Sequence, residues 1–129
     1  MKRNSANDIM NLKGVRPIVC LTAYTAPVAR ALDEHVDLLL VGDSLGMVLY
    51  DYENTLSVSL SQMIEHSKSV VNASDSSCIV VDLPFGTYEE SKEKAYLNSS
   101  NVMKETNCNA IKLEGGQNMH NTVKFLTER

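Results

Sequence analysis

Cysteine is scarce in this sequence, and its three copies form no recognisable pattern. Cys20, Cys78 and Cys108 are odd in number, lie far apart and include no C-x-x-C pair. This spacing excludes a disulfide framework and a zinc knuckle, and the apolar runs around each thiol predict buried, reduced cysteines. The three histidines, His66 among them, lack any H-x-x-x-H or H-E-x-x-H partner. We therefore predict no site built on histidine.

Basic residues are also in the minority, since 12 Lys and Arg stand against 16 Asp and Glu for a net charge of -4. They are scattered, so the sequence has no electrostatic footprint for nucleic acid. The basic opening, residues 1–8, is not followed by a secretory apolar segment, and no run reaches membrane-spanning length. The sequence predicts a cytoplasmic globular protein that binds neither nucleic acid nor a membrane. A small anionic metabolite remains compatible, because a bound cation can reverse the local field.

What is present is an alternation of apolar, strand-like runs with amphipathic helical segments. No repeat, low-complexity stretch or linker interrupts it, so we predict one continuous domain over residues 1–129. Right-handed β-α-β crossovers then give a parallel α/β sheet. It is either an open flavodoxin-like sheet or part of a (β/α)8 TIM barrel, which normally needs about 250 residues. The predicted strands cover residues 17–23, 36–41, 78–82 and 110–114, and the predicted helices cover 5–13, segments that start near Pro27 and Ser59, 87–105 and 119–127.

Local signals predict how these helices begin and which face they bury. The helix near Pro27 is expected to bury a stripe made by Val28, Ala31, Leu32 and Val36. Residues 49–56 are expected to form a loop that serves as a lid or an interface. Three helices are expected to begin with capping boxes, formed by Ser5 with Asp8, Ser59 with Gln62, and Thr87 with Glu90.

Acidic residues close three of the predicted strands: Asp43 follows the apolar run 38–42, Asp82 ends the run 79–82, and Glu114 ends the run 110–114. A carboxylate is a poor strand former, and the carboxyl ends of parallel strands open on one face, where ligands bind. Three convergent carboxylates repel one another unless protons or a cation intervene, and hard oxygen ligands favour magnesium. The sequence therefore predicts a Mg²⁺ site made by Asp43, Asp82 and Glu114.

Lys112 shares a strand face with Glu114, because side chains alternate along a strand. In a barrel this face points inward, toward the mouth where Asp43 and Asp82 would also lie. The alternative is a lysine that protects an edge strand from aggregation. The convergence of the carboxylates favours the functional interpretation of Lys112.

Ser44 lies in a glycine-containing segment, residues 42–46, that lacks both the G-x-G-x-x-G spacing and the Walker Gly-Lys-Ser/Thr. We therefore predict no phosphate loop, and expect the glycines to let the backbone turn beneath a ligand. Ser44 would present a hydroxyl and an N–H, beside Asp43, to a carboxylate or carbonyl oxygen. A helix or turn cap explains Ser44 equally well from spacing alone.

Four segments resemble one known family: L-T-A-Y at 21–24, L-V-G-D-S-L-G-M-V at 40–48, D-L-P-F-G-T-Y at 82–88 and I-K-L-E-G-G at 111–116. In this order and spacing they resemble ketopantoate hydroxymethyltransferase (3-methyl-2-oxobutanoate hydroxymethyltransferase). The resemblance covers essentially the whole chain, but only about the N-terminal half of the family's barrel. It implies a TIM barrel, of which this chain would be the first four β/α units plus an N-terminal helix.

This resemblance implies magnesium-dependent transfer of a hydroxymethyl group from 5,10-methylenetetrahydrofolate to 3-methyl-2-oxobutanoate, giving 2-dehydropantoate (ketopantoate). This is the first step of pantothenate and coenzyme A biosynthesis. Asp43, Asp82 and Glu114 match the family's metal-site acids. Ser44 and Lys112, with Asp43 and Asp82, match the positions that bind the oxo acid. The resemblance also implies a homo-oligomer for the full-length enzyme.

The family's general base, a glutamate, and its G-H-x-G-x-x-P-Q segment have no counterpart before Arg129. We therefore expect no catalytic residue in this chain and no activity from it alone.

Two departures from the family pattern fall in loops. Thr25 replaces an aspartate that often follows T-A-Y, and Asp51 and Ser57 replace a usual glycine and proline. We expect altered loop geometry with the chemistry kept. Two other functions stay open: another magnesium-dependent barrel that enolises oxo acids, isocitrate-lyase-like or phosphoenolpyruvate-mutase-like, and a non-catalytic flavodoxin-like metal-binding module. The V-G-D-S-L-G-M block favours the hydroxymethyltransferase.

Overall fold

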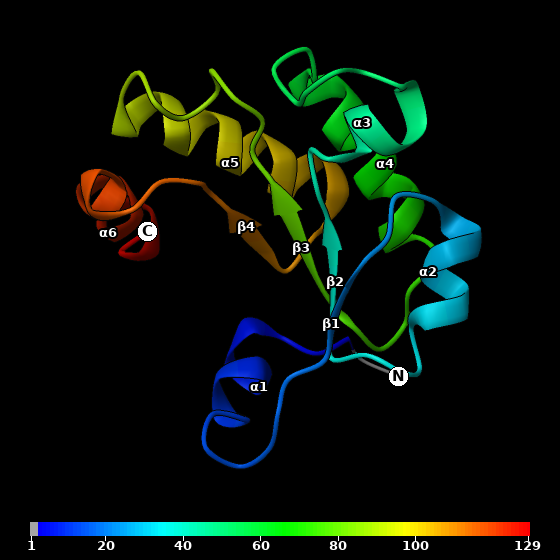
Figure 1. Ribbon diagram of the computed structural model, residues 1–129. Coiled ribbons are helices and arrows are strands. Elements are labelled where there is room, and N and C mark those ends of the chain that lie inside the picture. The colour runs from blue at the N-terminus through cyan, green and yellow to red at the C-terminus, as the bar shows by residue number, and fades with distance from the viewer. Residues whose placement is uncertain (1–2) are drawn as a thin grey trace.

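A computed structural model describes residues 3–129 and shows one parallel sheet with helices between its strands (Figure 1). The strands are short: β1 (Cys20–Thr22), β2 (Leu38–Val41), β3 (Cys78–Asp82) and β4 (Ala110–Lys112). The helices are α1 (Ala6–Asn11), α2 (Ala26–Leu32), α3 (Leu45–Tyr50), α4 (Leu60–Val71), α5 (Lys92–Thr106) and α6 (His120–Thr127), the last preceded by a 3₁₀ turn, Gln117–Met119.

The strands lie side by side in the order in which they occur along the chain, β1-β2-β3-β4, and every pair is parallel. A barrel adds each new strand to the same edge, whereas a doubly wound sheet reverses direction at a switch point. The consecutive order is therefore that of the first part of a TIM barrel, and the flavodoxin-like alternative is wrong in topology.

Two of the three predicted capping boxes are confirmed, those of Ser5 with Asp8 and of Ser59 with Gln62. The third is wrong. The Thr87 hydroxyl donates to the carbonyl of Pro84. Helix α5 begins at Lys92, and its N-cap is Ser91, whose side chain accepts the backbone N–H of Lys94. Pro84 and the following turn satisfy Thr87 locally, so this threonine has no helix to cap.

The segment after β2 also differs from the prediction. Residues 45–50 form helix α3, whereas a loop was expected over residues 49–56 and no helix was expected before it. Its close packing depends on Gly46, where a Cβ atom would lie 2.5 Å from Val58 Cγ2 and 3.0 Å from Tyr52 Cδ2. Asp51 ends the helix in the left-handed conformation, with φ 57°. Glycine adopts this backbone most easily, so the aspartate stands where a glycine would fit without strain.

One face of the sheet is packed against helices and forms the hydrophobic core. Leu39, Val41, Ile79 and Val81 point to this face and are fully buried. The predicted stripe on α2 is wrong in its first half, since Ala29 is buried on this helix while Val28 and Ala31 are exposed. Its second half is confirmed, because Leu32 and Val36 are partly buried and pack against the core. The small Ala29 side chain lets α2 lie close to the sheet.

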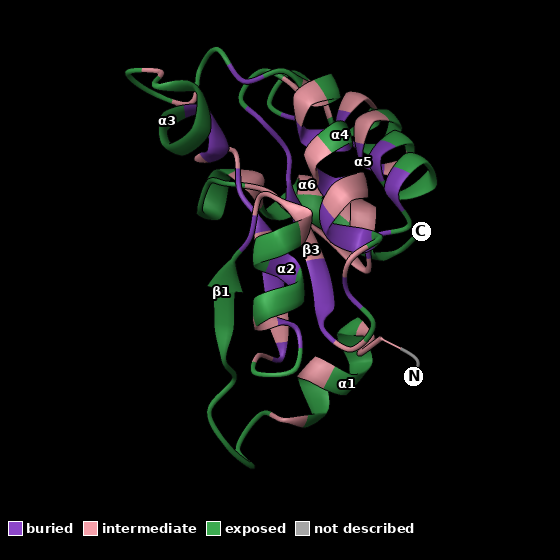
Figure 2. Ribbon diagram, turned by 90° about the vertical axis from the view of Figure 1, so that its right-hand side faces the viewer, coloured by how far each residue is buried: buried purple, intermediate pink, exposed green. Residues whose placement is uncertain are grey.

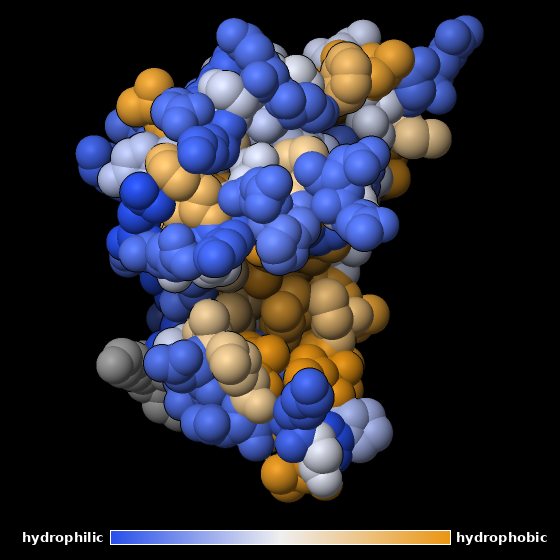
Figure 3. Space-filling model, turned by 90° about the vertical axis from the view of Figure 1, so that its left-hand side faces the viewer, coloured by the Kyte–Doolittle hydropathy of each residue, from blue (hydrophilic) through white to orange (hydrophobic). Residues whose placement is uncertain are grey.

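The alternate side chains of the same strands are less covered. Leu38, Leu40 and Val80 are only partly buried, and β1 is exposed along its length (Figure 2). Figure 3 shows hydrophobic side chains gathered in a recessed band across one side of the molecule. Cys20 on β1 is exposed while Cys78 and Cys108 are buried, so the prediction of buried thiols fails at the uncovered edge strand.

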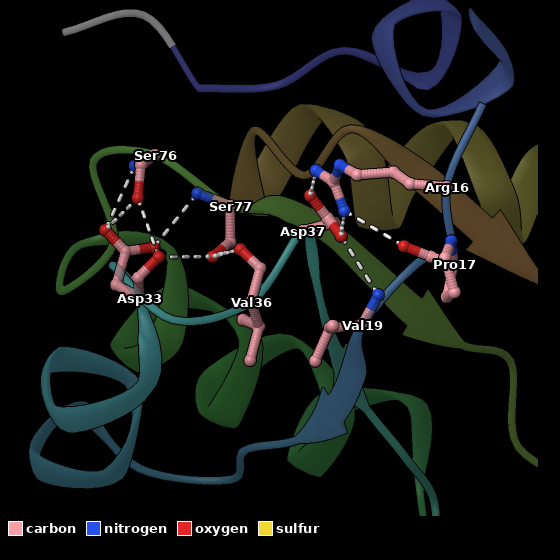
Figure 4. A network of polar contacts seen from close by, with 8 residues as sticks. All are labelled: Arg16, Pro17, Val19, Asp33, Val36, Asp37, Ser76 and Ser77. Carbon is pink, nitrogen blue, oxygen red and sulfur yellow. Dashed lines mark hydrogen bonds and ion pairs between the residues drawn. The ribbon is translucent and has the colours of Figure 1, made fainter. Parts of the chain in front are cut away.

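At the amino-terminal end of the sheet, two buried aspartates are saturated with donors (Figure 4). Asp33, which ends α2, accepts the backbone N–H groups of residues 75, 76 and 77 at 2.8 to 3.0 Å and also the Ser74 hydroxyl. Asp37, just before β2, pairs with the Arg16 guanidinium and accepts the N–H of Val19 at 2.9 Å. These contacts hold together the segments that precede β1, β2 and β3.

Over residues 3–129, no helix combines the length and apolar character needed to cross a membrane.

Candidate functional site

The carboxyl ends of the strands bring Asp82 and Lys112 together. Asp82 is the last residue of β3 and pairs in register with Lys112, the last residue of β4. The Lys112 ammonium donates a hydrogen bond to the Asp82 carboxylate and lies 3.7 Å from Glu114 Oε1. The predicted alternation along β4 is therefore confirmed for Lys112 and Glu114, which meet on one side of the strand. Lys112 does lie on the edge strand of the four, but its charge is directed at these acids.

The pKa values of Asp82 and Lys112 are both raised, for different reasons. Asp82 is only 4% exposed, and this burial raises the pKa of its carboxyl, against the hydrogen bond and charge of Lys112. Burial acts to lower the pKa of Lys112, but the hydrogen bond to Asp82 and the charges of Asp82, Glu114 and Asp43 raise it overall. One ammonium thus faces three carboxylates, so the site has more negative charge than it can neutralise by itself.

Asp43 joins this site from the carboxyl end of β2. Its carboxylate charge raises the pKa of Asp82, and its backbone N–H acts to lower that pKa. Gly42 makes the approach possible, because a Cβ atom there would lie 2.9 Å from Ser44 Oγ and 3.3 Å from Asp82 Oδ2. Gly42 has an ordinary negative φ, so this glycine is required for close approach and not for a special turn.

Ser44 begins α3, but its side chain makes no capping hydrogen bond. Its hydroxyl instead contacts the hydroxyl of Tyr24 at 2.8 Å. The helix-cap explanation of Ser44 is therefore not supported, and its oxygen lies close to Gly42 and on the side of Asp82. Tyr24 lies two residues beyond β1, so all four strands contribute to this end of the sheet.

Glu114 is the most peripheral of the three acids, with its side chain 71% exposed. Its backbone N–H donates to the hydroxyl of Tyr88 at 3.3 Å. Tyr88 is buried, which raises the pKa of its phenol. The tyrosine thereby holds the chain where it leaves β4, and Glu114 is placed beside Lys112 and not in direct contact with Asp82.

The three acids predicted to bind a metal lie at this end of the sheet, but they do not form a metal site between themselves. In the part of the chain from residue 3 onward, no three carboxylate, imidazole or thiol groups lie close enough to hold an ion between them. Asp82 and Glu114 each contact Lys112. The donor chemistry nevertheless fits magnesium, because oxygen ligands with excess negative charge are what this ion prefers.

Sequence reasoning missed three contributors to the site: Tyr24, Tyr88 and Gly42. Both tyrosines lie in the segments that resemble the family, but a single tyrosine has no spacing that marks it as functional. Gly42 was expected to provide a turn, and only the neighbouring Ser44 and Asp82 oxygens reveal its steric role.

Comparison with known proteins places the chain in one family. Residues 3–129 match the family model described as ketopantoate hydroxymethyltransferase. A 3-methyl-2-oxobutanoate hydroxymethyltransferase from Sinorhizobium fredii is 58% identical over 128 residues, which are 99% of this chain and 47% of the relative. Enzymes of the same name from Rhizobium etli and Paramagnetospirillum magneticum are each 56% identical, over 99% and 100% of this chain and 47% of each relative. The chain therefore spans about half the length of the curated relatives that it matches, and it belongs to the ketopantoate hydroxymethyltransferase family.

Proposed function

We propose that this chain forms the oxo-acid-binding and metal-binding part of an enzyme that converts 3-methyl-2-oxobutanoate into 2-dehydropantoate. The hydroxymethyl group would come from 5,10-methylenetetrahydrofolate, and the reaction would be the first step of pantothenate and coenzyme A biosynthesis. The observation that supports this most directly is the Asp82–Lys112 pair at the strand ends, with Asp43 and Glu114 beside it.

Each residue of the site has a distinct task in this proposal. Lys112 offers a partly exposed ammonium to the carboxylate or keto oxygen of the oxo acid. Ser44 offers a hydroxyl to the same group of oxygens. Asp43, Asp82 and Glu114 would hold Mg²⁺, which supplies positive charge that stabilises the enolate form of the substrate. The excess negative charge of the unliganded residues is then offset by the ion, and burial of Asp82 strengthens the attraction.

No residue of this chain is proposed to remove the C3 proton. The base would come from polypeptide that completes the barrel, and we propose that residues 1–129 alone do not catalyse the reaction. A missing general base typically costs about 100-fold to 10,000-fold in rate. We also propose a cytoplasmic location and a homo-oligomeric state for the complete enzyme.

The test follows exchange of the C3 proton of 3-methyl-2-oxobutanoate in deuterated water by NMR, because this step needs no folate. The protein is prepared in two forms, as residues 1–129 and together with the polypeptide that completes it. We expect Mg²⁺-dependent exchange only from the completed protein, and hydroxymethyl transfer only when the folate donor is added. Exchange without Mg²⁺, or product formation without folate, would contradict the proposal.

A further inference from the structure

We infer that Tyr24 is a positioning residue for Ser44, and that His66 on α4 holds Tyr24 in the place where it can do this. The inference deepens the proposed function and rests on it, because it assigns the Ser44 hydroxyl to the oxo acid. Its basis is a continuous set of hydrogen bonds that runs from helices α3 and α4 to the carboxyl end of the sheet.

The contact between Tyr24 and Ser44 decides what the serine can offer. Their hydroxyl oxygens are 2.8 Å apart, and a phenol is the more acidic of the two groups. With Tyr24 as the donor, the Ser44 oxygen is occupied as an acceptor and its own proton stays available for an oxygen of the substrate. Without Tyr24, the Ser44 side chain is free to rotate among its three staggered conformations.

The position of Tyr24 is in turn fixed by α4. His66 Nδ1 lies 2.7 Å from the backbone oxygen of Tyr24, and since a carbonyl only accepts, this nitrogen must donate. Tyr50 on α3 contacts the other ring nitrogen at 2.8 Å and lies edge-on to the imidazole. Ser69, one turn further along α4, accepts the N–H of Ala26 at 3.1 Å. The segment after β1 is thus tied to α4 at two points on either side of Thr25.

Nothing in the sequence marks His66 as part of a site, because it lies in the middle of an amphipathic helix without a metal-binding partner. Its role becomes visible only through the two contacts of its ring. It touches no residue proposed to bind the substrate, so its influence has to pass through Tyr24. A purely structural role would stabilise the fold without changing the affinity for the oxo acid.

The experiment is a double-mutant cycle on the completed protein, measuring the dissociation constant of 3-methyl-2-oxobutanoate in the presence of Mg²⁺ by calorimetry. Tyr24→Phe deletes one hydroxyl and should weaken binding by about 3- to 10-fold. In a Ser44→Ala background the same change should have no further effect, because the group that it positions is gone. Equal losses in both backgrounds would overturn the inference. Tyr96→Phe on α5 is the control and should leave the affinity unchanged.

Two substitutions of His66 separate its contacts. An asparagine amide nitrogen can occupy the place of Nδ1, so His66→Asn should keep the bond to the Tyr24 carbonyl and most of the affinity. A glutamine nitrogen reaches the place of Nε2 instead, so His66→Gln should lower the affinity about as much as Tyr24→Phe does. Equal affinities for the two variants would contradict a role through Tyr24.

A third measurement does not depend on the oxo acid. Side-chain couplings from NMR should show one Ser44 rotamer in the wild type and several in Tyr24→Phe. If the rotamer responds in this way but neither protein binds the oxo acid, the positioning contact stands and the proposed function fails. An unchanged Ser44 rotamer in Tyr24→Phe would overturn the positioning role itself.

Discussion

The two ends of the sheet hold buried aspartates in opposite electrostatic situations. Asp33 and Asp37 at the amino-terminal end are 7% and 8% exposed, and Asp82 at the carboxyl-terminal end is 4% exposed. Burial is therefore nearly equal. Burial acts to raise the pKa of Asp33, but its serine and backbone donors lower it overall, and the Arg16 hydrogen bond lowers the pKa of Asp37 to about 2. The pKa of Asp82 is raised.

The difference lies in the number of donors and in the neighbouring charges. At the amino-terminal end, every carboxylate oxygen of Asp33 and Asp37 accepts hydrogen bonds from N–H or O–H groups. These bonds favour the ionised form of each carboxyl and fix the segments that donate them. At the carboxyl-terminal end Lys112 is shared between Asp82 and Glu114, with Asp43 nearby. The first arrangement is neutralised by its own donors, and the second keeps an excess of negative charge.

The largest effect on stability should come from Asp33→Ala. Removing this side chain leaves several buried donors from residues 74–77 without an acceptor, which should lower the free energy of unfolding by about 3 kcal/mol. Urea denaturation gives this quantity. Glu34→Ala, at the exposed neighbouring position, is the control and should stay within about 0.5 kcal/mol of the wild type. Equal losses in the two variants would show that the amino-terminal carboxylate is not the locking element.

Lys112→Met should have the reverse profile, with affinity lost and folding kept. Methionine keeps most of the apolar stem and removes the charge, so binding of 3-methyl-2-oxobutanoate should weaken by about 10-fold or more. Asp82 then loses its cation, so the unfolding midpoint should fall, but the protein should stay folded because the lysine side chain is 40% exposed. Calorimetry and denaturation of the same preparation test both halves. Full affinity in a folded variant would restore the edge-strand explanation of Lys112.

The aspartates at the two ends of the sheet should contribute to stability with opposite dependence on pH. The pKa of Asp37 is about 2 in the folded state against an ordinary 3.8, so its contribution is present above 3.8 and is lost as pH falls toward 2. Asp33 has the same direction. The raised pKa of Asp82 gives a contribution that is present below 3.8 and is lost as pH rises.

Unfolding midpoints from about pH 2 to about pH 6 should therefore diverge between two variants. Relative to the wild type, Asp82→Asn should gain stability as pH rises through this range, and Asp37→Asn should lose it. Parallel curves for the two variants would contradict the contrast between the ends of the sheet.

The sequence predicts the carboxyl-terminal end better than the amino-terminal one. Asp43, Asp82 and Glu114 are recognisable because each follows an apolar strand, and parallel strands end on one face. The network around Asp33 is invisible by comparison, since it joins an ordinary helix end to a serine-rich loop 41 to 44 residues away. Contacts over such separations depend on how the elements pack, and no local pattern encodes them.

The sequence predicted correctly which segments are helices and which are strands, but it predicted their boundaries and buried faces less well. The strand at residues 78–82 is confirmed to the residue, because a buried central strand is a continuous apolar run ended by Pro84. The predicted face of α2 was right at Leu32 and wrong at Val28, because large apolar residues were assumed to point inward, whereas the close packing selects Ala29. The edge strands β1 and β4 are shorter than predicted, since each pairs on one side only.

The carboxyl-terminal end of the sheet is proposed to carry unneutralised negative charge that binds a divalent cation together with the oxo acid. The most direct test is calorimetric titration of Mg²⁺ and 3-methyl-2-oxobutanoate into the completed wild-type protein and into Asp82→Asn, which keeps the size of the side chain and removes its charge. We predict Mg²⁺-dependent binding in the wild type and a loss of at least about 100-fold in Asp82→Asn, with both proteins folded. Unchanged Mg²⁺-dependent affinity in the Asp82→Asn protein would contradict the claim.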